Sequence, residues 1–362
     1  MTSNEVHDQL TEWLAAQQPG VDDLRIAGLD RVEFGHSAEM LALTLAWRAD
    51  GVERRQDVVV RLRPPPPGLL EPYDMERQFQ VLRALGETDV RSPGALWLEP
   101  TGDVLGRPFY VMQRLDGEVY EREVPDEIRA APQRVRRMSE NLVREIARIH
   151  QVDLAATGLA DLGDGTEYLD RQLKHWASEI HRVKRGPVPG LERLHAELLE
   201  SQPEPCPRVA LVHGDTKPGN FAFVGDDVSA VFDWEMTDVG DPLADIGWAE
   251  VTWPLAGFTA LPGALSGDEL VTLYEELTGT MVRHREWYRA FQGFKMTVIL
   301  FLGSMLVDSG ASDDLRLASM GGVVPMFTDR ALKELGIDEA LDSGPVAPRD
   351  ERLRAVKAKA GA

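Results

Sequence analysis

The stretch LVHGDTKPGNFAF, residues 211–223, determines how the rest of this sequence is interpreted. An apolar run leads into a histidine, a short polar segment follows, and a second apolar run begins, as in a loop between two buried strands. Pro218-Gly219 provides a turn inside that loop. The turn allows Asp215 and Asn220, which stand five residues apart, to direct their side chains toward one place.

A second stretch, AVFDWEMTDVGDPLADIGW (230–248), starts as an apolar strand and ends in acidic residues. Mg²⁺ takes oxygen ligands, usually one or two carboxylates together with phosphate oxygens. Asp233 at the end of this strand, with Asn220, meets that requirement, and Glu235 either reaches a second ion or hydrogen-bonds the loop. A calcium loop starting at Asp233 is excluded, because the sequence lacks the glycine and glutamate that such a loop needs. We expect these three residues to be the metal ligands.

The spacing of His213, Asp215 and Asn220 is H-x-D-x-x-x-x-N, the catalytic-loop pattern of kinases. In that pattern the aspartate accepts the proton of the substrate hydroxyl and the asparagine holds a metal ion. Lys217 lies two residues after the aspartate and can neutralise charge on the transferred phosphoryl group. We therefore expect Asp215 and Lys217 to be catalytic, and His213 to have a structural hydrogen-bonding role.

The nucleotide is expected to bind in the β-rich N-terminal part of the chain. DVVVRLR (57–63) lies where a kinase carries the lysine that pairs with the α- and β-phosphates. Arg61 is the preferred cation, with Arg63 on the same strand face or a merely exposed edge-strand arginine as alternatives. FGHSAE (34–39), with Gly35 and Ser37, lies between strands and is predicted to cover the phosphates through backbone N–H groups.

The run YVMQR (110–114) is strand-like and precedes the connection between the two predicted lobes. We expect backbone groups of Gln113 and Arg114 to hydrogen-bond the adenine edge there, and Met112 to line its pocket. An ordinary core strand is the alternative for Met112.

Length and charge limit the class of protein. A chain of 362 residues suggests two domains or one large bilobal unit, at roughly 150 residues per domain. The formal net charge of −21 disfavours nucleic-acid and membrane-surface partners. The single cysteine, Cys206, and the absence of a secretory signal at the N-terminus predict a reducing, cytoplasmic location. The apolar run 291–307 contains Lys295 and predicts a buried helix rather than a membrane span.

The fold class predicted from these patterns is α+β, as a bilobal protein-kinase-like fold. Residues 1–114 are expected to form a small nucleotide-binding lobe with a five-stranded sheet and a helix, and Asp50-Gly51 predicts a hairpin within it. Residues 115–342 are expected to form a larger, mainly helical lobe that carries the catalytic and metal-binding loops. Residues 343–362, rich in proline, alanine and charge, predict a flexible tail.

On these residues the chain resembles the aminoglycoside phosphotransferase (choline-kinase-like) family of small-molecule kinases, and within it the subgroup found fused to acyl-CoA dehydrogenases. The resemblance extends over residues 25–300, and four stretches carry it in the right order: VVVRLRPPPPGLLEPYDMERQFQVLRAL, PFYVMQRLDGEV, GLADLGDGTEYLDRQLKHW and VFDWEMTDVGDPLADIGW. It implies a phosphotransferase that uses ATP and Mg²⁺ and acts on a small-molecule hydroxyl. It also implies that Asp215 is the base, that Asn220 and Asp233 bind the metal, and that Arg61 replaces the nucleotide lysine.

One departure concerns the helix that normally pairs with the strand cation. Members of the subgroup carry an Arg-Glu pair there, and this chain has Arg77-Gln78. A neutral Gln78 cannot pair with the charge of Arg61, so Arg61 must be held differently or the helix must move. Glu76 lies on roughly the opposite helix face and is a poor substitute. The catalytic aspartate and the metal ligands are all present, so we expect an active enzyme.

Two other classes of protein compete with this interpretation. A catalytically weak, pseudokinase-like module that only binds nucleotide is the first, since Gln78 is consistent with a degraded site. A protein kinase is disfavoured, because the chain has no G-x-G-x-x-G and no D-F-G. The acceptor stays open between an antibiotic such as an aminoglycoside and a hydroxylated acyl or other metabolic compound, and so does the oligomeric state.

Overall fold

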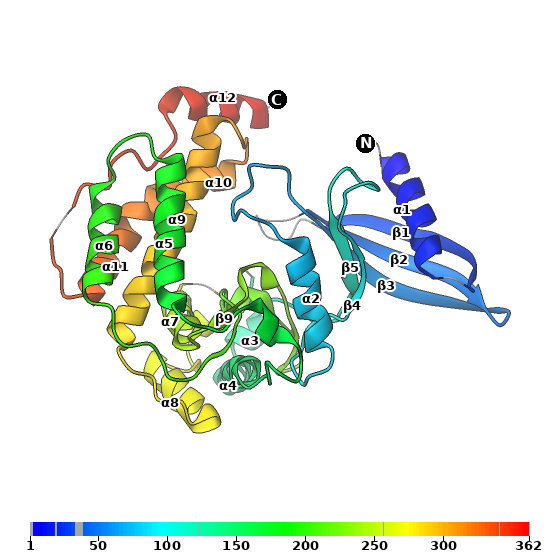
Figure 1. The fold of residues 1–362 in the computed structure, drawn as a ribbon, viewed down its shortest axis with the longest axis horizontal. Coiled ribbons are helices and arrows are strands. Elements are labelled where there is room, and N and C mark those ends of the chain that lie inside the picture. The colour runs from blue at the N-terminus through cyan, green and yellow to red at the C-terminus, as the bar shows by residue number, and fades with distance from the viewer. Residues whose placement is uncertain are drawn as a thin grey trace. The chain divides into compact units, whose positions relative to one another are not determined.

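A computed structural model describes residues 3–18, 20–32, 39–121, 123–255, 257–339 and 341–361. The chain divides into two units (Figure 1). The sheet unit comprises Met1–Glu118, Ala222–Val224 and Ser229–Glu235, and the helical unit comprises Val119–Phe221, Gly225–Val228 and Met236–Ala362. The sequence predicted a boundary after residue 114, and it did not predict that two short segments beyond residue 220 return to the first unit.

The sheet unit is built on five antiparallel strands in the order β1-β2-β3-β5-β4, as predicted. The strands are β1 (Asp22–Val32), β2 (Glu39–Ala49), β3 (Val52–Leu62), β4 (Ala95–Glu99) and β5 (Phe109–Gln113). The Asp50-Gly51 hairpin between β2 and β3 is confirmed. Both turn residues have positive φ, 52° and 77°, which matches the right-handed twist of the flanking strands.

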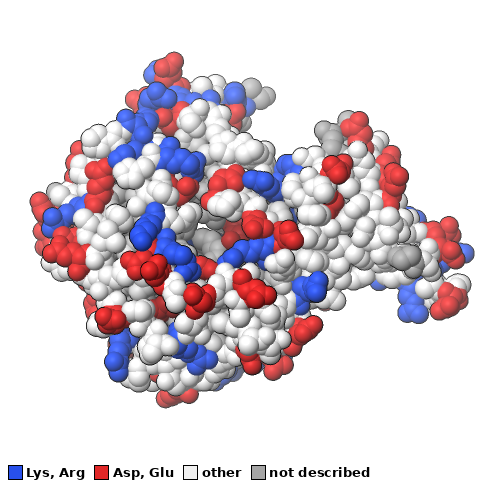
Figure 2. Space-filling model, viewed as in Figure 1, with Lys and Arg blue, Asp and Glu red and all other residues white. Residues whose placement is uncertain are grey.

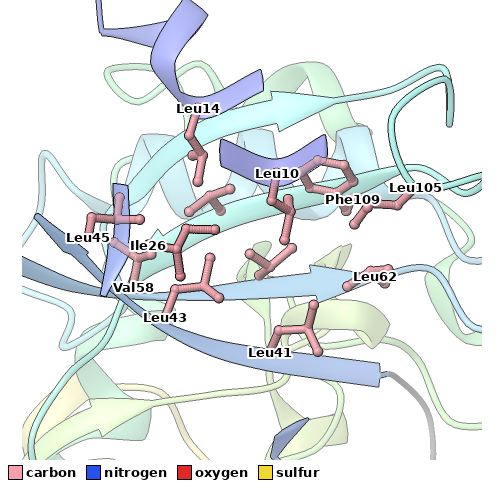
Figure 3. Packing of buried hydrophobic residues seen from close by; sticks show 12 residues of the cluster. Leu10, Leu14, Ile26, Leu41, Leu43, Leu45, Val58, Leu62, Leu105 and Phe109 are labelled. Carbon is pink, nitrogen blue, oxygen red and sulfur yellow. The ribbon is translucent and has the colours of Figure 1, made fainter. Parts of the chain in front are cut away.

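Helix α1 (Ser3–Gln17) closes one side of this unit's core. Figure 3 shows Leu10 and Leu14 directed from α1 toward alternate residues of the strands, among them Leu43 of β2. Side chains two residues apart on a strand share one face, so β2 alone contributes three leucines to this core. Helix α2 (Met75–Leu85) packs on β4 and β5, and its N-cap Asp74 accepts a hydrogen bond from the backbone N–H of Arg77 at 2.9 Å.

The helical unit is organised around helix α9 (Arg285–Ser309), which contains the apolar run. The other helices are α3 (Asp126–Arg129), α4 (Pro132–His150), α5 (Tyr168–Val183), α6 (Pro189–Glu200), α7 (Leu243–Thr252), α8 (Gly267–Thr278), α10 (Leu315–Met320), α11 (Val324–Glu334) and α12 (Asp350–Ala360). Among them α5, α6, α7, α10, α11 and α12 pack on α9. Helix α9 is long and apolar enough to cross a membrane, but 83% of its most apolar window is buried by protein, as expected for a core helix.

Four short strands complete the chain. In the helical unit, β6 (Ala210–Val212) pairs antiparallel with β9 (Asp238–Gly240), so the start of the 211–223 stretch lies beside the middle of the 230–248 stretch. A second small sheet consists of β7 (Phe221–Val224) and β8 (Asp227–Val231). The visible face of the helical unit carries basic and acidic side chains interspersed, despite the acidic balance of the whole chain (Figure 2).

The prediction of a flexible tail was wrong for most of that segment. Residues 350–360 form α12, whose Val356 is fully buried, and Arg352 donates to the carbonyl of Val307 at 2.8 Å. Alanine, arginine and lysine favour helix, and this propensity outweighs the charge on which the prediction relied.

Candidate active site

The loop that carries Asp215 begins where β6 ends, and its shape depends on Gly214. This glycine has φ of +83°, and a Cβ at this position would lie 2.5 Å from the carbonyl oxygen of Met236. Only glycine satisfies both restrictions. The loop therefore turns sharply just before the predicted catalytic residue.

Asp215 is buried, and each of its carboxylate oxygens has a defined neighbour. Trp248, on α7, donates its indole N–H to Oδ1 at 2.7 Å, and Nζ of Lys217 lies 3.3 Å from Oδ2. Burial tends to raise the pKa of Asp215, but the charges of Lys217 and Lys295 more than reverse this and hold the pKa below its usual value. Asp215 is therefore an ionised, oriented carboxylate, as a general base requires.

Asn220 is fixed to the same loop. Its side-chain Nδ2 donates to the backbone carbonyl of Asp215 at 2.8 Å, and its backbone N–H donates to the carbonyl of Lys217 at 3.0 Å. Residues Pro218–Asn220 form the short 3₁₀ turn that brings these groups together. Because the amide nitrogen is engaged, Oδ1 is the atom with which Asn220 can bind a cation.

Asp245 of α7 holds the start of the loop through hydrogen bonds to its backbone. It accepts the backbone N–H groups of His213 at 2.7 Å and of Gly214 at 2.8 Å, and it also bonds Nε2 of His150 at 3.0 Å. Burial tends to raise the pKa of Asp245, but these hydrogen bonds and the nearby histidines lower it overall. The Nδ1 atom of His213 accepts the N–H of Asp215 at 3.1 Å, which agrees with the structural role predicted for this histidine.

In the sheet unit, Arg61 of β3 is buried and pairs with both acidic metal-ligand candidates. Its Nη2 lies 2.8 Å from Oδ1 of Asp233 and 2.7 Å from Oε2 of Glu235, and only 6% of its side chain is exposed. Burial lowers the pKa of Arg61, but the charge and hydrogen bond of Asp233 together with Tyr110 and Glu235 more than offset burial, so the pKa is raised overall. Asp233 also has a positive φ of 65°, an unfavourable conformation for a residue with a side chain. The three residues form one charge cluster.

This cluster shows how Arg61 is held although α2 has Gln78 in place of the glutamate of the subgroup. The two acids of the 233–235 segment supply the negative charge, and Gln78 instead accepts a 3.4 Å hydrogen bond from the hydroxyl of Tyr110. Arg63, the alternative cation, is 38% exposed and lies 3.5 Å from Glu71. The structure thus favours Arg61 over Arg63 as the buried cation.

The other residues predicted to contact the nucleotide lie partly within the described part of the chain. Gly35 and Ser37 lie outside the described residues. Met112 is buried in β5, while the N–H of Gln113 donates to Gly94 at 2.8 Å and that of Arg114 to Asp57 at 3.2 Å. Because both N–H groups are engaged, the backbone groups of Gln113 and Arg114 that stay predicted to bind the adenine edge are their carbonyl oxygens.

The donor set suits magnesium better than a metal held by protein alone. Within the described ranges there is no group of three or more His, Cys, Asp or Glu side chains that could hold an ion. A Mg²⁺ ion usually binds one or two carboxylates, with phosphate oxygens and water completing its shell. In the sheet unit, Asp233 and Glu235 are ligands of that type, and in the helical unit the amide oxygen of Asn220 is another.

Sequence reasoning missed two residues beside Asp215. Trp248 was not predicted as a partner of Asp215, and Lys295 was used only as evidence against a membrane span. The structure places Nζ of Lys295 in a hydrogen bond with the carbonyl of Gly214 and 4.5 Å from the ring centroid of Trp248. The position of a lone lysine in an apolar helical run is the sequence signal that could have pointed to the role of Lys295.

A five-stranded antiparallel sheet followed by a mainly helical region, with this loop after the first strand of the helical part, defines a kinase-like fold. Residues 42–281 match the model of the family described as Phosphotransferase enzyme family (APH), and the chain belongs to this family.

Curated relatives include much longer proteins. The acyl-CoA dehydrogenase family member 10 of Mus musculus is 33% identical over 215 residues, which cover 58% of this chain and 20% of that protein. Member 11 of Rattus norvegicus is 29% identical over 236 residues, which cover 62% of this chain and 29% of that protein. The chain thus spans less than a third of the length of either relative.

Solved structures share the fold over nearly the whole chain. A Ralstonia eutropha protein provisionally named an aminoglycoside phosphotransferase has a TM-score of 0.71 and 24% identity, covering 91% of this chain and 98% of that one. A thermostable mutant of the aminoglycoside phosphotransferase APH(4)-Ia, in a ternary complex with AMP-PNP and hygromycin B, has a TM-score of 0.56 and 16% identity. The match covers 93% of this chain and 99% of that one.

Proposed function

We propose that this protein transfers the terminal phosphoryl group of ATP to a hydroxyl group of a small molecule, with Mg²⁺ as the cofactor. The observation that supports this most strongly is the state of Asp215. Its carboxylate is ionised, is fixed at Oδ1 by Trp248, and has Oδ2 beside the cationic Lys217. This is the arrangement that a hydroxyl group needs in order to be oriented and deprotonated.

The proposed reaction forms one bond and breaks one. The acceptor oxygen bonds to the γ-phosphorus, the bond from that phosphorus to the β–γ bridging oxygen breaks, and ADP leaves. The proton of the hydroxyl passes to Oδ2 of Asp215, and Lys217 offsets charge on the transferred group. When bound, Mg²⁺ supplies further charge neutralisation at the phosphates, and we assign its protein ligands to Asn220, Asp233 and Glu235.

For the nucleotide we propose Arg61 as the phosphate-binding cation. It is buried and always charged, and its guanidinium can bind phosphate oxygens in a bidentate manner. The solved relatives with AMP-PNP or ADP bound support an adenine nucleotide as the donor. Gly35 and Ser37 remain proposed phosphate contacts through their backbone.

For the acceptor we propose a hydroxylated acyl compound rather than a polycationic antibiotic. The curated relatives are named acyl-CoA dehydrogenase family members, which favours the acyl class. In addition, the buried carboxylates of α5 and α7 are already paired. Glu179 bonds Arg182, Glu250 bonds Arg285, and Asp245 bonds the catalytic loop. A polycationic acceptor would need carboxylates that are open to it.

The test is phosphate transfer from ATP to two panels of acceptors, acyl-CoA thioesters with hydroxyl groups at different chain positions and a set of aminoglycosides. We expect Mg²⁺-dependent ADP formation and a phosphorylated product with the first panel. The Asp215→Asn variant should lack this activity, and Asp329→Asn, whose side chain on α11 is half exposed, should retain it. ATP binding with no product from either panel would favour the nucleotide-binding module instead.

A further inference from the structure

The chemistry proposed above makes no use of Lys295, although this residue lies in the core beside Asp215. It is 4% exposed on α9, in the middle of the apolar run. Removing an ammonium group from water is unfavourable unless partners compensate for it. The partners of this lysine therefore indicate why the charge is there.

The ammonium group contacts the catalytic loop directly. Nζ of Lys295 donates a hydrogen bond to the backbone carbonyl of Gly214, the residue immediately before Asp215. Gly214 is the sharp turn of the loop, with positive φ, and its N–H already donates to Asp245. Lys295 thus fixes the other side of the same peptide segment, 81 residues away in the sequence.

The ammonium group of Lys295 is also linked to the carboxylate of Asp215 indirectly, by way of the indole ring of Trp248. It lies 4.5 Å from the centroid of Trp248, within the range of a cation–π contact. The indole N–H of Trp248 is the group that donates to Oδ1 of Asp215 at 2.7 Å. A cation over the ring face withdraws electron density and makes the N–H a stronger donor, because linked polar contacts polarise one another.

We propose that Lys295 is a positioning residue for Asp215, which it orients through the Gly214 carbonyl and the Trp248 indole. With Oδ1 held by the indole, Oδ2 is the oxygen that faces the acceptor hydroxyl. The inference rests on the proposed function of Asp215 as the base. Lys295 itself touches neither the nucleotide nor the acceptor in this role.

The charges around Lys295 give the proposal a pH signature. Burial lowers the pKa of Lys295 to about 8, while Asp215 and Asp245 oppose this effect and Lys217 adds to it. Besides these groups of the catalytic loop and α7, His175 of α5 faces Lys295, and its own pKa is lowered chiefly by burial. Lys295 is thus the member of this set that changes charge near pH 8.

The decisive measurement is the indole ¹H–¹⁵N resonance of Trp248, one of eight tryptophans, assigned with the Trp248→Phe variant. In the wild type, we expect this resonance to shift between pH 6.5 and 9.5 with a midpoint near 8, as Lys295 loses its proton. In Lys295→Met the shift should be absent, and the resonance should lie at the wild-type high-pH position. In Lys295→Arg it should stay near the low-pH position throughout, because a guanidinium does not titrate there.

Kinetics provide the second readout once an acceptor is known. Lys295→Met should reduce kcat by about 100-fold with an unchanged KM for ATP, the size of effect expected when a reacting group is slightly misplaced. In the wild type, kcat should decline above about pH 8 as Lys295 loses its proton. Lys295→Arg should recover part of the lost kcat and should not show this decline. The matched control is Gln292→Met, a buried polar residue three positions earlier on α9, which should keep wild-type activity and a wild-type indole titration.

Two outcomes would overturn the inference. One is an indole titration that is absent in the wild type or unchanged in Lys295→Met. The other is full kcat in a folded Lys295→Met protein. A wild-type protein that transfers no phosphate to any acceptor would contradict the proposed function alone, because the indole measurement needs no substrate and still decides the role of Lys295.

Discussion

The guanidinium Nη2 of Arg61 lies 2.8 Å from Oδ1 of Asp233, so the predicted phosphate cation is paired with the predicted metal ligand. Glu235 shares the same nitrogen at 2.7 Å. A nucleotide and a metal ion would bind to opposite charges of this cluster. Nucleotide phosphates would draw Arg61 away, and a cation would replace Arg61 on the carboxylates. Binding of ATP and binding of the metal should therefore reinforce each other.

The first prediction concerns removal of this cation. Arg61→Ala leaves two carboxylates without their counter-ion, and breaking such a buried pair is expected to destabilise the fold by about 3–5 kcal/mol. Because Mg²⁺ or Mn²⁺ can replace the missing charge, the melting temperature of the variant should rise with divalent metal more steeply than that of the wild type. ATP affinity should fall. Thermal melts in a metal titration measure this, and Arg63→Ala is the control that should respond like the wild type. An equal rise of the melting temperature with metal in Arg61→Ala and the wild type would contradict the prediction.

The second prediction concerns Asp215 itself. Asp215→Asn keeps the shape of the side chain and removes its basicity, so transferase activity should fall by about 10²–10⁴-fold, the range for loss of a general base. The free energy of unfolding should change little, because the amide oxygen can still accept the Trp248 N–H. Steady-state kinetics and urea denaturation test this together. A variant with wild-type kcat would show that another group accepts the proton.

The third prediction concerns the hydrogen bonds that Asp245 makes to the loop. Asp245→Ala removes the side-chain partner of two buried backbone N–H groups, those of His213 and Gly214, and of Nε2 of His150. We expect a loss of about 2–5 kcal/mol in the free energy of unfolding, since each buried unsatisfied group contributes about 1–3 kcal/mol. Urea denaturation measures the loss. The half-exposed Asp329→Ala serves as the control and should stay within about 0.5 kcal/mol of the wild type.

The fourth prediction separates backbone strain from steric conflict at Gly214. Gly214→Ala introduces a Cβ that would lie 2.5 Å from the carbonyl of Met236, at φ of +83°. Gly336 has a similar φ of +77° with no atom within 4 Å of the added Cβ. Gly336→Ala should therefore show the strain alone, about 1 kcal/mol, and Gly214→Ala a larger loss together with lower activity. Equal losses of stability in the two variants would mean that the loop shifts freely to admit the methyl group.

The fifth prediction follows from the lowered pKa of Lys295. Its folded pKa of about 8 is below the usual 10.5, so between these values the unfolded chain binds more protons than the native protein. Stability of the wild type should therefore gain a contribution as the pH rises from 8 to 10, on the order of 1–3 kcal/mol. Lys295→Met should lack it. The difference between the two proteins in urea denaturation at pH 7 and pH 10 isolates this term, and a difference that does not change with pH would contradict it.

The sequence alone predicted the two-part kinase-like fold, the five-stranded sheet, the hairpin at Asp50-Gly51 and the buried nature of the helix around 291–307. It also led to the family, because the patterns around Asp215 and Asp233 depend on spacing along a short segment, where turn geometry and strand alternation act over a few residues. Its prediction of the tail from residue 343 was wrong. The helix propensity of residues 350–360 outweighs their charge, and contacts with α9, which no local pattern contains, add to the stability of this helix.

Only the tertiary structure decided what surrounds the functional groups. Arg61 meets Asp233 and Glu235 more than 170 residues away, and Lys295 of α9 reaches Gly214 and the ring of Trp248. The physical reason is that the charge state of a buried group depends on the few atoms packed within several ångströms of it, and burial raises the strength of each of those interactions. The sequence determines which residues a loop carries, while the packing of distant elements determines the electrostatic environment, and so the charge state, of those residues.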